Sequence, residues 1–490
     1  MFGPLCSLAF MKKQDNFAAH ELPSFARYLN KVFDFRTAVA TLTDARVEPE
    51  ISPAAVFLAT FHGFLFRLRS FQQLEAEVAH PAFQNWIGAP RAFQDDVLRY
   101  SLCGFSLPPL EAMLVDVNRT LKRNKVFDEG RVQGCIVAAV DGIEILSSYS
   151  RCCDACLERR VAVRKGGVKV EQLQYYHRAV ACQIVSSPVK AVLATEWVQP
   201  GESEDAAALR LLRKLPERYG SRFFDILLLD ALYAQEAVLQ CAAERGWELV
   251  ITLKRNRPEL YASAIRLFAH RPPDWEFAET VGGKKYQGQI WDTPGLPLSA
   301  ADSPLLRVVR SEEKLTQNHY RGGQLQPETT EHEWMWITTL ETQSFPAKIV
   351  RALGHDRWKQ ENCGWNDLTQ NWSLKHGFLH ACRHRPHVTA KHRAVEPVTK
   401  LAATATSSPA PEGPDHDEDP RIPNHGLAAV VLILMLAFTL CGAFTQCHSK
   451  LVRRYHLTGV EVARQLRVSV SKLPPRIRAP DSPAPQSPTI

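Results

Sequence analysis

The order of hydrophobic and polar positions predicts a helical region followed by a mixed sheet. Over residues 1–130 apolar side chains recur at helical spacing, as in ISPAAVFLATFHGFLFRLRSFQQL, and strand-like alternation is scarce. The run GCIVAAVD is short, rich in Val and Ile, and ends in Asp141, which is typical of a buried strand with a carboxylate at its C-terminal end. We therefore place the change from helices to strands at about residue 131.

Strand and helix patterns then alternate. YYHRAVACQIVSSPVKAVLATEW predicts two strands joined by a hairpin. A helix pattern precedes the strand FFDILLLD, which ends in Asp230, and a second helix pattern precedes the strand ELVITLK. Residues 256–350 show short alternating stretches rich in Trp, Gly and Pro, and a helix from about Gly354 carries Glu361. The whole pattern favours an α/β fold, with helices on the faces of a mixed sheet and an inserted β-rich module.

One segment is uninterrupted by charge. Gly426 to Phe444 is apolar for 19 residues, which is just enough to span a bilayer as a helix. A buried core helix is the alternative, and the content of Ala, Gly and Thr together with the lack of a second such span favours it. A membrane-anchored protein with structural acids stays open as a separate hypothesis.

Composition changes this picture little. The 490 residues are 45% hydrophobic, which is ordinary for a globular protein, and the formal charge of +7 fits a polyanionic partner without requiring one. The chain has 12 cysteines, and its first ten residues lack the basic leading region of a secretory segment. We therefore expect a reducing, cytoplasmic location.

Three acids carry the candidate chemistry. Asp141 and Asp230 each end a predicted strand, so their carboxylates can meet at one edge of the sheet, and Glu361 can close the site from a helix. Carboxylate oxygens are the ligands that Mg²⁺ and Mn²⁺ prefer. Two such ions about 3.5 to 4 Å apart are what a phosphodiester-cleaving enzyme needs to activate the attacking oxygen and stabilise the leaving one.

The flanks of these acids resemble a known family. AVDGIEILSS, SRCCDACLERR, YYHRAVA, LLLDALYAQ, ELVITLKRN, EWMWITTL and HDRWKQENCGWNDL, in this order over about Gly134 to His380, resemble the DDE transposases of bacterial insertion sequences. The resemblance implies an RNase H-like core with a β-rich insertion, two Mg²⁺ or Mn²⁺ ions, and cleavage of double-stranded DNA at transposon ends followed by strand transfer to target DNA. It also implies a homodimer in a synaptic complex, a nucleoid-associated location and no small-molecule cofactor.

The resemblance carries over to single residues. It makes Asp141, Asp230 and Glu361 the catalytic, metal-binding acids. On the glutamate helix, Arg357 lies four residues before Glu361, at the spacing where two side chains share one helix face. The residues that we expect to contact DNA, from this helix and the nearby basic clusters, are Arg357, Asn362, Lys375, Lys254 and Arg255.

Two positions depart from the family pattern. Leu368 or Thr369 stands where the family has a lysine, and Gly354 stands where a tyrosine is expected. Lys375 is a candidate substitute for the lysine. An inactive or decayed relative that still binds DNA is therefore the alternative function.

These inferences give the following expected boundaries. The segments are 1–130, an N-terminal helical and candidate DNA-end-binding region; 131–255, the first part of the catalytic core; 256–350, the β-rich insertion; 351–385, the catalytic helix; 386–424, a disordered insertion rich in Pro, Ala, Thr and Ser; 425–470, a C-terminal helical part of the core; and 471–490, a disordered tail.

A second group of residues has metal-ligand character. Cys153 and Cys156 form a CxxC motif, with Cys152 before it and His177 after it, and these four side chains could hold a structural Zn²⁺. Because a second tight pair of ligands is missing, buried thiols in a reducing cell are the alternative.

Other conspicuous residues have competing interpretations. Asp225 is the rival acid in the strand of Asp230, and Glu144 is a solvent-facing or supporting acid. Two further sets, each either DNA-contacting or part of the core, are the tryptophans Trp291, Trp334 and Trp336 and the histidines His376 and His380.

Overall fold

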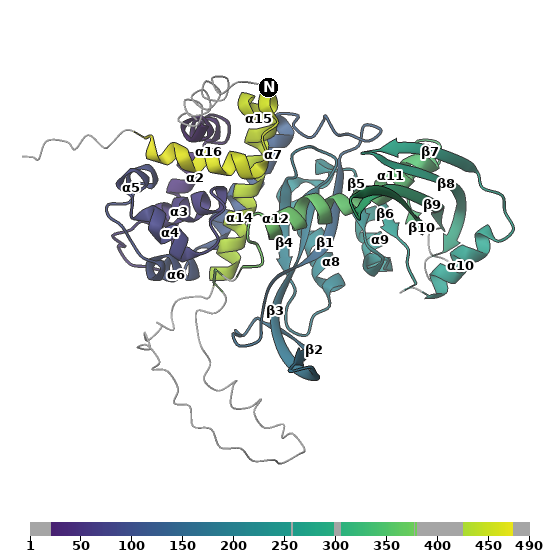
Figure 1. Cartoon of the computed structure of the whole chain (residues 1–490), viewed down its shortest axis with the longest axis horizontal. Coiled ribbons are helices and arrows are strands. Elements are labelled where there is room, and N and C mark those ends of the chain that lie inside the picture. The colour runs from purple at the N-terminus through teal and green to yellow at the C-terminus, as the bar shows by residue number, and fades with distance from the viewer. Residues whose placement is uncertain (1–20, 256–257, 298–304, 377, 380–424, 474–490) are drawn as a thin grey trace, which may run out of the picture. The chain divides into compact units, whose positions relative to one another are not determined.

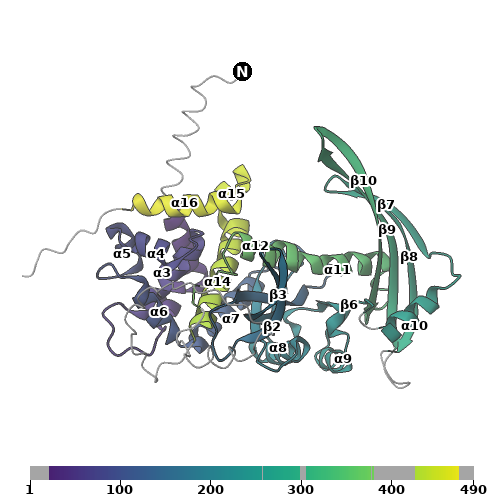
Figure 2. The same ribbon diagram turned by 60° about the horizontal axis from the view of Figure 1, so that its bottom comes forward.

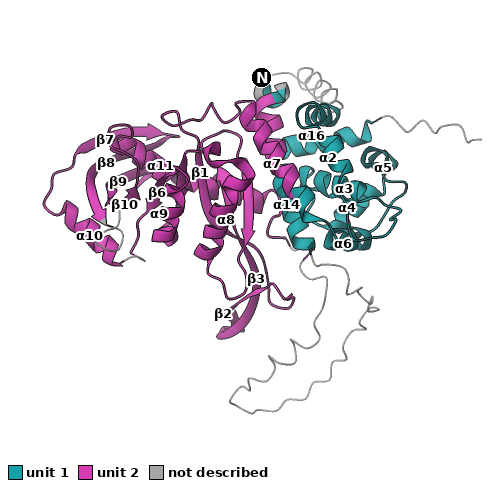
Figure 3. Cartoon of the chain, turned by 180° about the vertical axis from the view of Figure 1, so that it is seen from behind, with its two compact units in different colours: residues 1–110, 412–437, 448–490 teal, residues 111–411, 438–447 magenta. Residues whose placement is uncertain are grey.

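The computed structural model describes residues 21–255, 258–297, 305–376, 378–379 and 425–473 (Figure 1 and Figure 2). The expected insertion at 386–424, His380 and most of the expected tail lie outside these residues. The chain forms two compact units (Figure 3). Unit 1 comprises Met1–Leu110, Glu412–Ala437 and His448–Ile490, and unit 2 comprises Glu111–Pro411 and Phe438–Cys447.

Unit 1 is helical where it is described. Serine and threonine caps start several of its helices: the Ser52 hydroxyl accepts from the Ala55 amide, and Thr458 forms a capping box with Glu461. Its elements are a helix at 21–33, α2 (Phe35–Ala40), α3 (Pro53–Leu65), α4 (Phe71–Val78), α5 (Pro81–Ile87), α6 (Asp95–Cys103), α15 (Lys450–Tyr455) and α16 (Gly459–Ser471). Two helices, α7 (Leu107–Arg123) and α14 (Gly426–Ala443), continue from this unit into unit 2.

Unit 2 is built on a mixed sheet. Its first six strands are β1 (Val137–Ser148), β2 (Leu157–Lys165), β3 (Val168–Ile184), β4 (Val192–Trp197), β5 (Ile226–Leu229) and β6 (Glu248–Thr252). β3 pairs antiparallel with β1, β2 and β4, whereas β1, β5 and β6 run parallel (Figure 1). The order β4-β3-β1-β5-β6, with helices α8 (Glu204–Tyr219) and α9 (Glu236–Ala243) between strands, is an RNase H-like arrangement. The predicted α/β fold class is confirmed.

The β-rich insertion extends this same sheet. After helix α10 (Pro258–Phe268), strands β7 (Trp275–Val281), β8 (Lys284–Pro297), β9 (Leu305–Arg321) and β10 (Gln324–Thr338) form an antiparallel meander. β10 pairs antiparallel with β6, so the insertion continues the core without a break (Figure 2). Helix α11 (Ala347–Lys359) follows and leads into a π-helical turn, η3 (Gln360–Trp365), and α12 (Asn366–Gln370).

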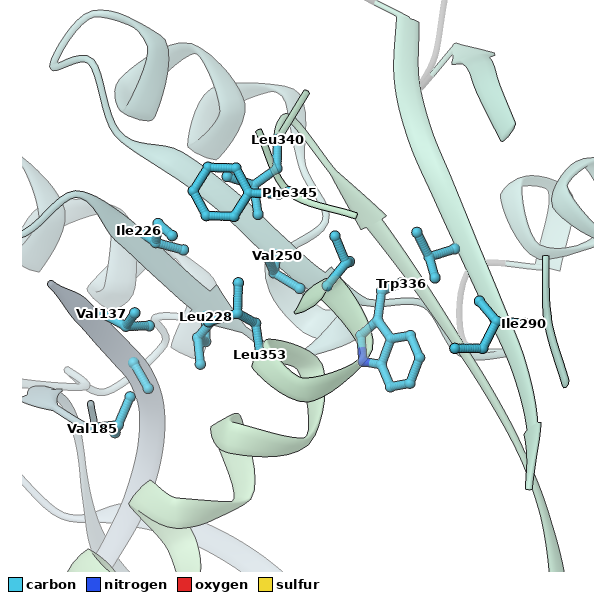
Figure 4. Packing of buried hydrophobic residues seen from close by; sticks show 13 residues of the cluster. Val137, Val185, Ile226, Leu228, Val250, Ile290, Trp336, Leu340, Phe345 and Leu353 are labelled. Carbon is cyan, nitrogen blue, oxygen red and sulfur yellow. The ribbon is translucent and has the colours of Figure 1, made fainter. Parts of the chain in front are cut away.

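The hydrophobic core of unit 2 joins the insertion to the central strands. Val137, Leu228 and Val250 from the parallel strands, Trp336 from β10 and Leu353 from α11 are all buried in one cluster (Figure 4). Burial of apolar surface in such a cluster stabilises the fold by about 25 cal/mol for each Å² removed from water. Helix α11, which leads directly into the turn that carries Glu361, is therefore packed against the strands that carry Asp141 and Asp230.

Gly354 is required for this packing, which explains a departure from the family pattern. A Cβ atom built at Gly354 would overlap the indole ring of Trp336, and it would meet the ring Nε1 atom most closely. Because the Trp336 side chain is buried, with Trp334 stacked on it and His355 packed against it edge to face, it cannot yield easily. A tyrosine at this position is incompatible with Trp336 as it lies here.

We expect Gly354→Ala to destabilise the protein by about 1 to 3 kcal/mol, the usual effect of overpacking a core. Gly442→Ala is the matched control, because the nearest atom to a Cβ there is 3.9 Å away, on Val189. Thermal unfolding of both variants checks the prediction. A Gly354→Ala variant as stable as the control would show that Trp336 can move aside.

Helix α14 is the apolar segment seen in the sequence. Within the described residues, one helical stretch, Gly426–His448, is long and apolar enough to cross a membrane by length and composition. In this structure 83% of its most apolar window is buried inside the protein. Burial to this extent is what a core helix shows, so it favours the core interpretation over the membrane interpretation.

Candidate catalytic carboxylates on the neighbouring strands β1 and β5

Asp141 and Asp230 occupy equivalent positions on neighbouring strands. β1 and β5 are parallel, with Val140 opposite Leu229, and Asp141 and Asp230 directly follow these two residues. β5 ends at Leu229, as predicted, but β1 continues past Asp141 to Ser148 because it stays paired with β3, so the expected strand end at Asp141 is wrong. The apolar residues before each acid are fully buried, so the strands are anchored up to the point where the carboxylates begin. The side chains themselves are 20% and 27% exposed. Two carboxylates therefore lie on neighbouring central strands, just beyond the point where the pairing of β1 with β5 ends.

The Asp141 carboxylate accepts two hydrogen bonds and is largely buried. Its Oδ1 accepts from the Gly142 amide at 2.9 Å, and its Oδ2 pairs with Arg357 Nη1 at 3.0 Å. Burial raises the pKa of Asp141 to about 6; the Arg357 charge and the Gly142 amide act to lower it, whereas Asp230 and Glu204 act to raise it. The attraction to Arg357 therefore does not fully offset the free-energy cost of burying the ionised carboxylate.

Asp230 has a more complete set of partners. Lys254 Nζ lies 2.8 Å from its Oδ1. Burial acts to raise the pKa of Asp230, but Lys254, the Ala231 amide and Arg357 more than offset it, so the pKa lies below its usual value. Since Lys254 lies just beyond β6 and is half exposed, it can turn away from the carboxylate without disturbing the core.

Glu361 lies on the helical turn that covers β1 and β3. The neighbouring Gln360 is buried and donates to the Ala181 carbonyl at 3.0 Å, and Ala181 is the β3 partner of Asp141. Gly364 allows the same turn to approach Gln183, because a Cβ there would overlap that side chain. Glu361 is half-buried; its backbone carbonyl accepts from the Asn366 amide, and its carboxylate forms no ion pair within the part of the chain that the structure describes. A π-helical turn of this kind is frequent at functional sites.

A fourth carboxylate, which the sequence did not indicate, links the two aspartate strands. Glu204, at the start of α8, accepts from the Tyr233 hydroxyl at 2.8 Å and pairs with Arg178 of β3. Gly142 lies so close to it that a Cβ atom there would overlap its carboxylate. Tyr233 follows Asp230 by three residues, and Gly142 follows Asp141 directly. Glu204 is thus in contact with the flanks of both aspartates, and an acid in the first turn of a helix carries no signal of such a role.

The predicted DNA-contacting residues fall into two groups. Lys254, Arg255, Asn362 and Lys375 are exposed, as contact with a phosphate backbone requires. Arg357 is different: it is 4% exposed, and it pairs with Asp141 beneath the turn that carries Glu361. Contact of these residues with DNA stays a prediction.

The second departure from the family pattern also has a structural context. Leu368 is fully buried in α12, and Thr369 is half-buried. Neither side chain offers a cation, whereas Lys375, a few residues further, is exposed. Lys375 is therefore the candidate for the missing lysine.

The rival acids have structural partners. Asp225 accepts from the Ile136 amide at 2.7 Å, which fixes the start of β1 beside β5. Glu144 forms a two-bond ion pair with Arg159. Both interactions explain these residues without catalysis.

Two of the three tryptophans considered for DNA contact lie in the core of the insertion. Trp336 and Trp291 are 1% and 6% exposed, and Trp334 stacks on Trp336 with ring centroids 6.3 Å apart. Burial leaves little ring surface for an unpaired base, so the core interpretation is favoured for Trp291 and Trp336. His376 is exposed and contacts Phe378 edge to face.

The carboxylates suit a divalent cation in ligand type. Asp141, Asp230 and Glu361 supply hard oxygen ligands, and the raised pKa of Asp141 means that added positive charge would favour its ionised form. In this structure the three acids are not within 4.8 Å of one another as a set; among the described residues one group meets that criterion, Cys153, Cys156 and His177. Binding of ions by the acids would therefore require Lys254 to turn away and Glu361 to approach.

Comparison with known proteins adds one structural similarity. No protein-family model and no curated protein matches the chain. Among solved structures, a piggyBac transposase in a synaptic complex with hairpin DNA aligns over 96% of this chain and 83% of its own, with 10% sequence identity and a TM-score of 0.33.

Proposed function

We propose that this protein is a metal-dependent DNA phosphoryl-transfer enzyme, an insertion-sequence transposase of the DDE type. The observation that carries the proposal is the position of Asp141 and Asp230, which directly follow the last paired residues of the neighbouring parallel strands β1 and β5, near the helical turn that carries Glu361. Hard carboxylate ligands at the edge of an RNase H-like sheet suit phosphodiester chemistry with Mg²⁺ or Mn²⁺.

The residues have separate roles in this proposal. Asp141 and Asp230 hold the ions, Glu361 completes the ligand set, and the bound ions supply activation of the attacking oxygen and stabilisation of the leaving oxygen. Arg357 is fixed by burial, so it orients Asp141. Lys254, released from Asp230, is free to pair with a DNA phosphate, as the exposed Arg255, Asn362 and Lys375 also are.

The proposed partners follow from this chemistry. The substrates are double-stranded transposon ends, the product 3′-hydroxyl then attacks target DNA, and two copies of the chain act in one synaptic complex. The location proposed is the cytoplasm, on the nucleoid.

A cleavage assay tests the proposal directly. A DNA duplex that carries the ends of the element encoding this chain is incubated with the protein and Mn²⁺, and nicks are mapped to the nucleotide. Nicks at the element boundary that leave a 3′-hydroxyl, and that require the metal, are the expected result. Binding of the ends without any nick would instead support the inactive relative, which the apolar Leu368 favours.

Glu204 gives a second prediction at this site. Glu204→Gln should reduce cleavage about 10- to 100-fold and raise the Mn²⁺ concentration needed for half-maximal activity, because residues that orient metal ligands have effects of this size. Glu217→Gln on the exposed face of the same helix is the control and should match the wild type. An unchanged metal requirement in Glu204→Gln would show that Glu204 only stabilises the fold.

A further inference from the structure

A second candidate metal centre lies away from the carboxylates, at the base of the β2–β3 hairpin. Cys153 and Cys156 lie in the connection between β1 and β2, and His177 lies on β3, opposite Leu146 of β1. The three side chains come from segments more than 20 residues apart in sequence, yet their ligand atoms all lie within 4.8 Å of one another.

The distances match the edges of a zinc tetrahedron. Cys153 Sγ and Cys156 Sγ are 3.7 Å apart, and they lie 3.3 and 3.4 Å from His177 Nε2. With Zn–S near 2.3 Å and Zn–N near 2.0 Å, tetrahedral coordination places two sulfurs about 3.8 Å apart and sulfur about 3.6 Å from nitrogen. A disulfide is excluded here, since it would require an S–S distance of about 2.05 Å.

The backbone folds the CxxC segment around the sulfurs. The Cys153 amide donates to Cys156 Sγ at 3.3 Å, and the Cys156 amide donates to the Cys153 carbonyl at 3.1 Å, so the segment forms a tight turn around the sulfur. Cys156 and His177 are 8% and 6% exposed, which is typical of a closed structural site rather than an open catalytic one.

We propose that Cys153, Cys156 and His177 bind one structural Zn²⁺, with Cys152 as the fourth ligand. Cys152 is half-buried and directly precedes the CxxC turn, and it is the remaining thiol of this loop. The ion would fasten the β1–β2 connection to β3, in the strand pair that also holds Asp141. Because this assignment rests on its own geometry, it stands whether or not the protein cleaves DNA.

Metal analysis of the purified full chain tests the proposal. Inductively coupled plasma mass spectrometry should find about one zinc per chain in the wild type, and less than a tenth of that in Cys153→Ser and His177→Asn. Cys135→Ser is the matched control, since this half-buried thiol lies outside the cluster, and it should retain the zinc. Retention of zinc by Cys153→Ser, or a metal-free wild type that takes up none on refolding with zinc, would overturn the assignment.

A measurement on the wild type keeps the test valid if these variants fail to fold. Replacement of zinc by Co²⁺ should give visible bands of tetrahedral cobalt with thiolate charge transfer, and Cys152→Ser should weaken the charge transfer if Cys152 is the fourth ligand. Unchanged charge transfer in Cys152→Ser would overturn the fourth-ligand assignment. Peptide mass mapping that finds a disulfide between Cys153 and Cys156 in the purified wild type would overturn the whole proposal.

Discussion

Asp230→Asn should reduce metal-dependent DNA cleavage by more than about 100-fold, because it removes a charged ligand and not merely a residue that orients one. Asparagine keeps the size of the side chain and can still accept from the Ala231 amide, so the fold around the end of β5 should persist. What is lost is the negative charge beside Asp141 and the partner of Lys254. Nicking of labelled transposon ends at saturating Mn²⁺ measures the effect, and circular dichroism verifies the fold.

Asp225→Asn is the matched control, because Asp225 lies at the other end of the same strand. Its Oδ2 accepts from the Ile136 amide, a role that the asparagine carbonyl oxygen can also fill. This variant should therefore cleave DNA at a rate close to that of the wild type. If Asp225→Asn were the inactive variant and Asp230→Asn the active one, the assignment of the site to Asp141 and Asp230 would be wrong.

The sequence allowed the strands and their acids to be predicted because their signal is local. An apolar run that ends in a carboxylate predicts a strand end at that carboxylate, and both GCIVAAVD and FFDILLLD have this form. The prediction is confirmed for Asp230, which follows β5, but it is wrong for Asp141, because pairing with β3 continues β1 to Ser148. The α/β class and the β-rich insertion follow in the same way from alternating patterns. What the patterns do not give is the pairing of β10 with β6, which makes the insertion part of the central sheet.

The electrostatic partners of the acids could not be read from the sequence, since they depend on distant contacts. Arg357 is 216 residues from Asp141 along the chain, and its burial against that acid differs from the phosphate contact expected of it. Glu204 reaches Gly142 and Tyr233 only because α8 lies beside both strand ends. The need for glycine at position 354 could not be predicted either, because it depends on where the Trp336 ring lies in the folded protein.

A buried ion-pair network between the insertion and α11 gives the prediction with the largest expected effect on stability. Glu313 of β9 is 3% exposed, and both of its oxygens pair with Arg351 at 2.9 Å. His355, one turn further along α11, also lies 2.9 Å from Glu313. Arg351→Met would leave the Glu313 carboxylate buried without its main partner, so we expect a loss of about 3 to 5 kcal/mol. Urea unfolding followed by tryptophan fluorescence measures it, since Trp334 and Trp336 contact His355.

The pH dependence of this loss distinguishes the buried charge from simple packing. Burial acts to raise the pKa of Glu313, but His355 and Arg351 lower it to about 2, below the ordinary value of 4.5. The wild type therefore has this stabilisation above pH 4.5 and loses it as the pH falls toward 2, so the difference between wild type and Arg351→Met should shrink over that range. Lys314→Met, which breaks the exposed pair with Glu331, is the control and should lose less than about 1 kcal/mol. Equal losses in the two variants would mean that the network contributes no more than a surface ion pair, and α11 would then be held on the sheet by its apolar contacts alone.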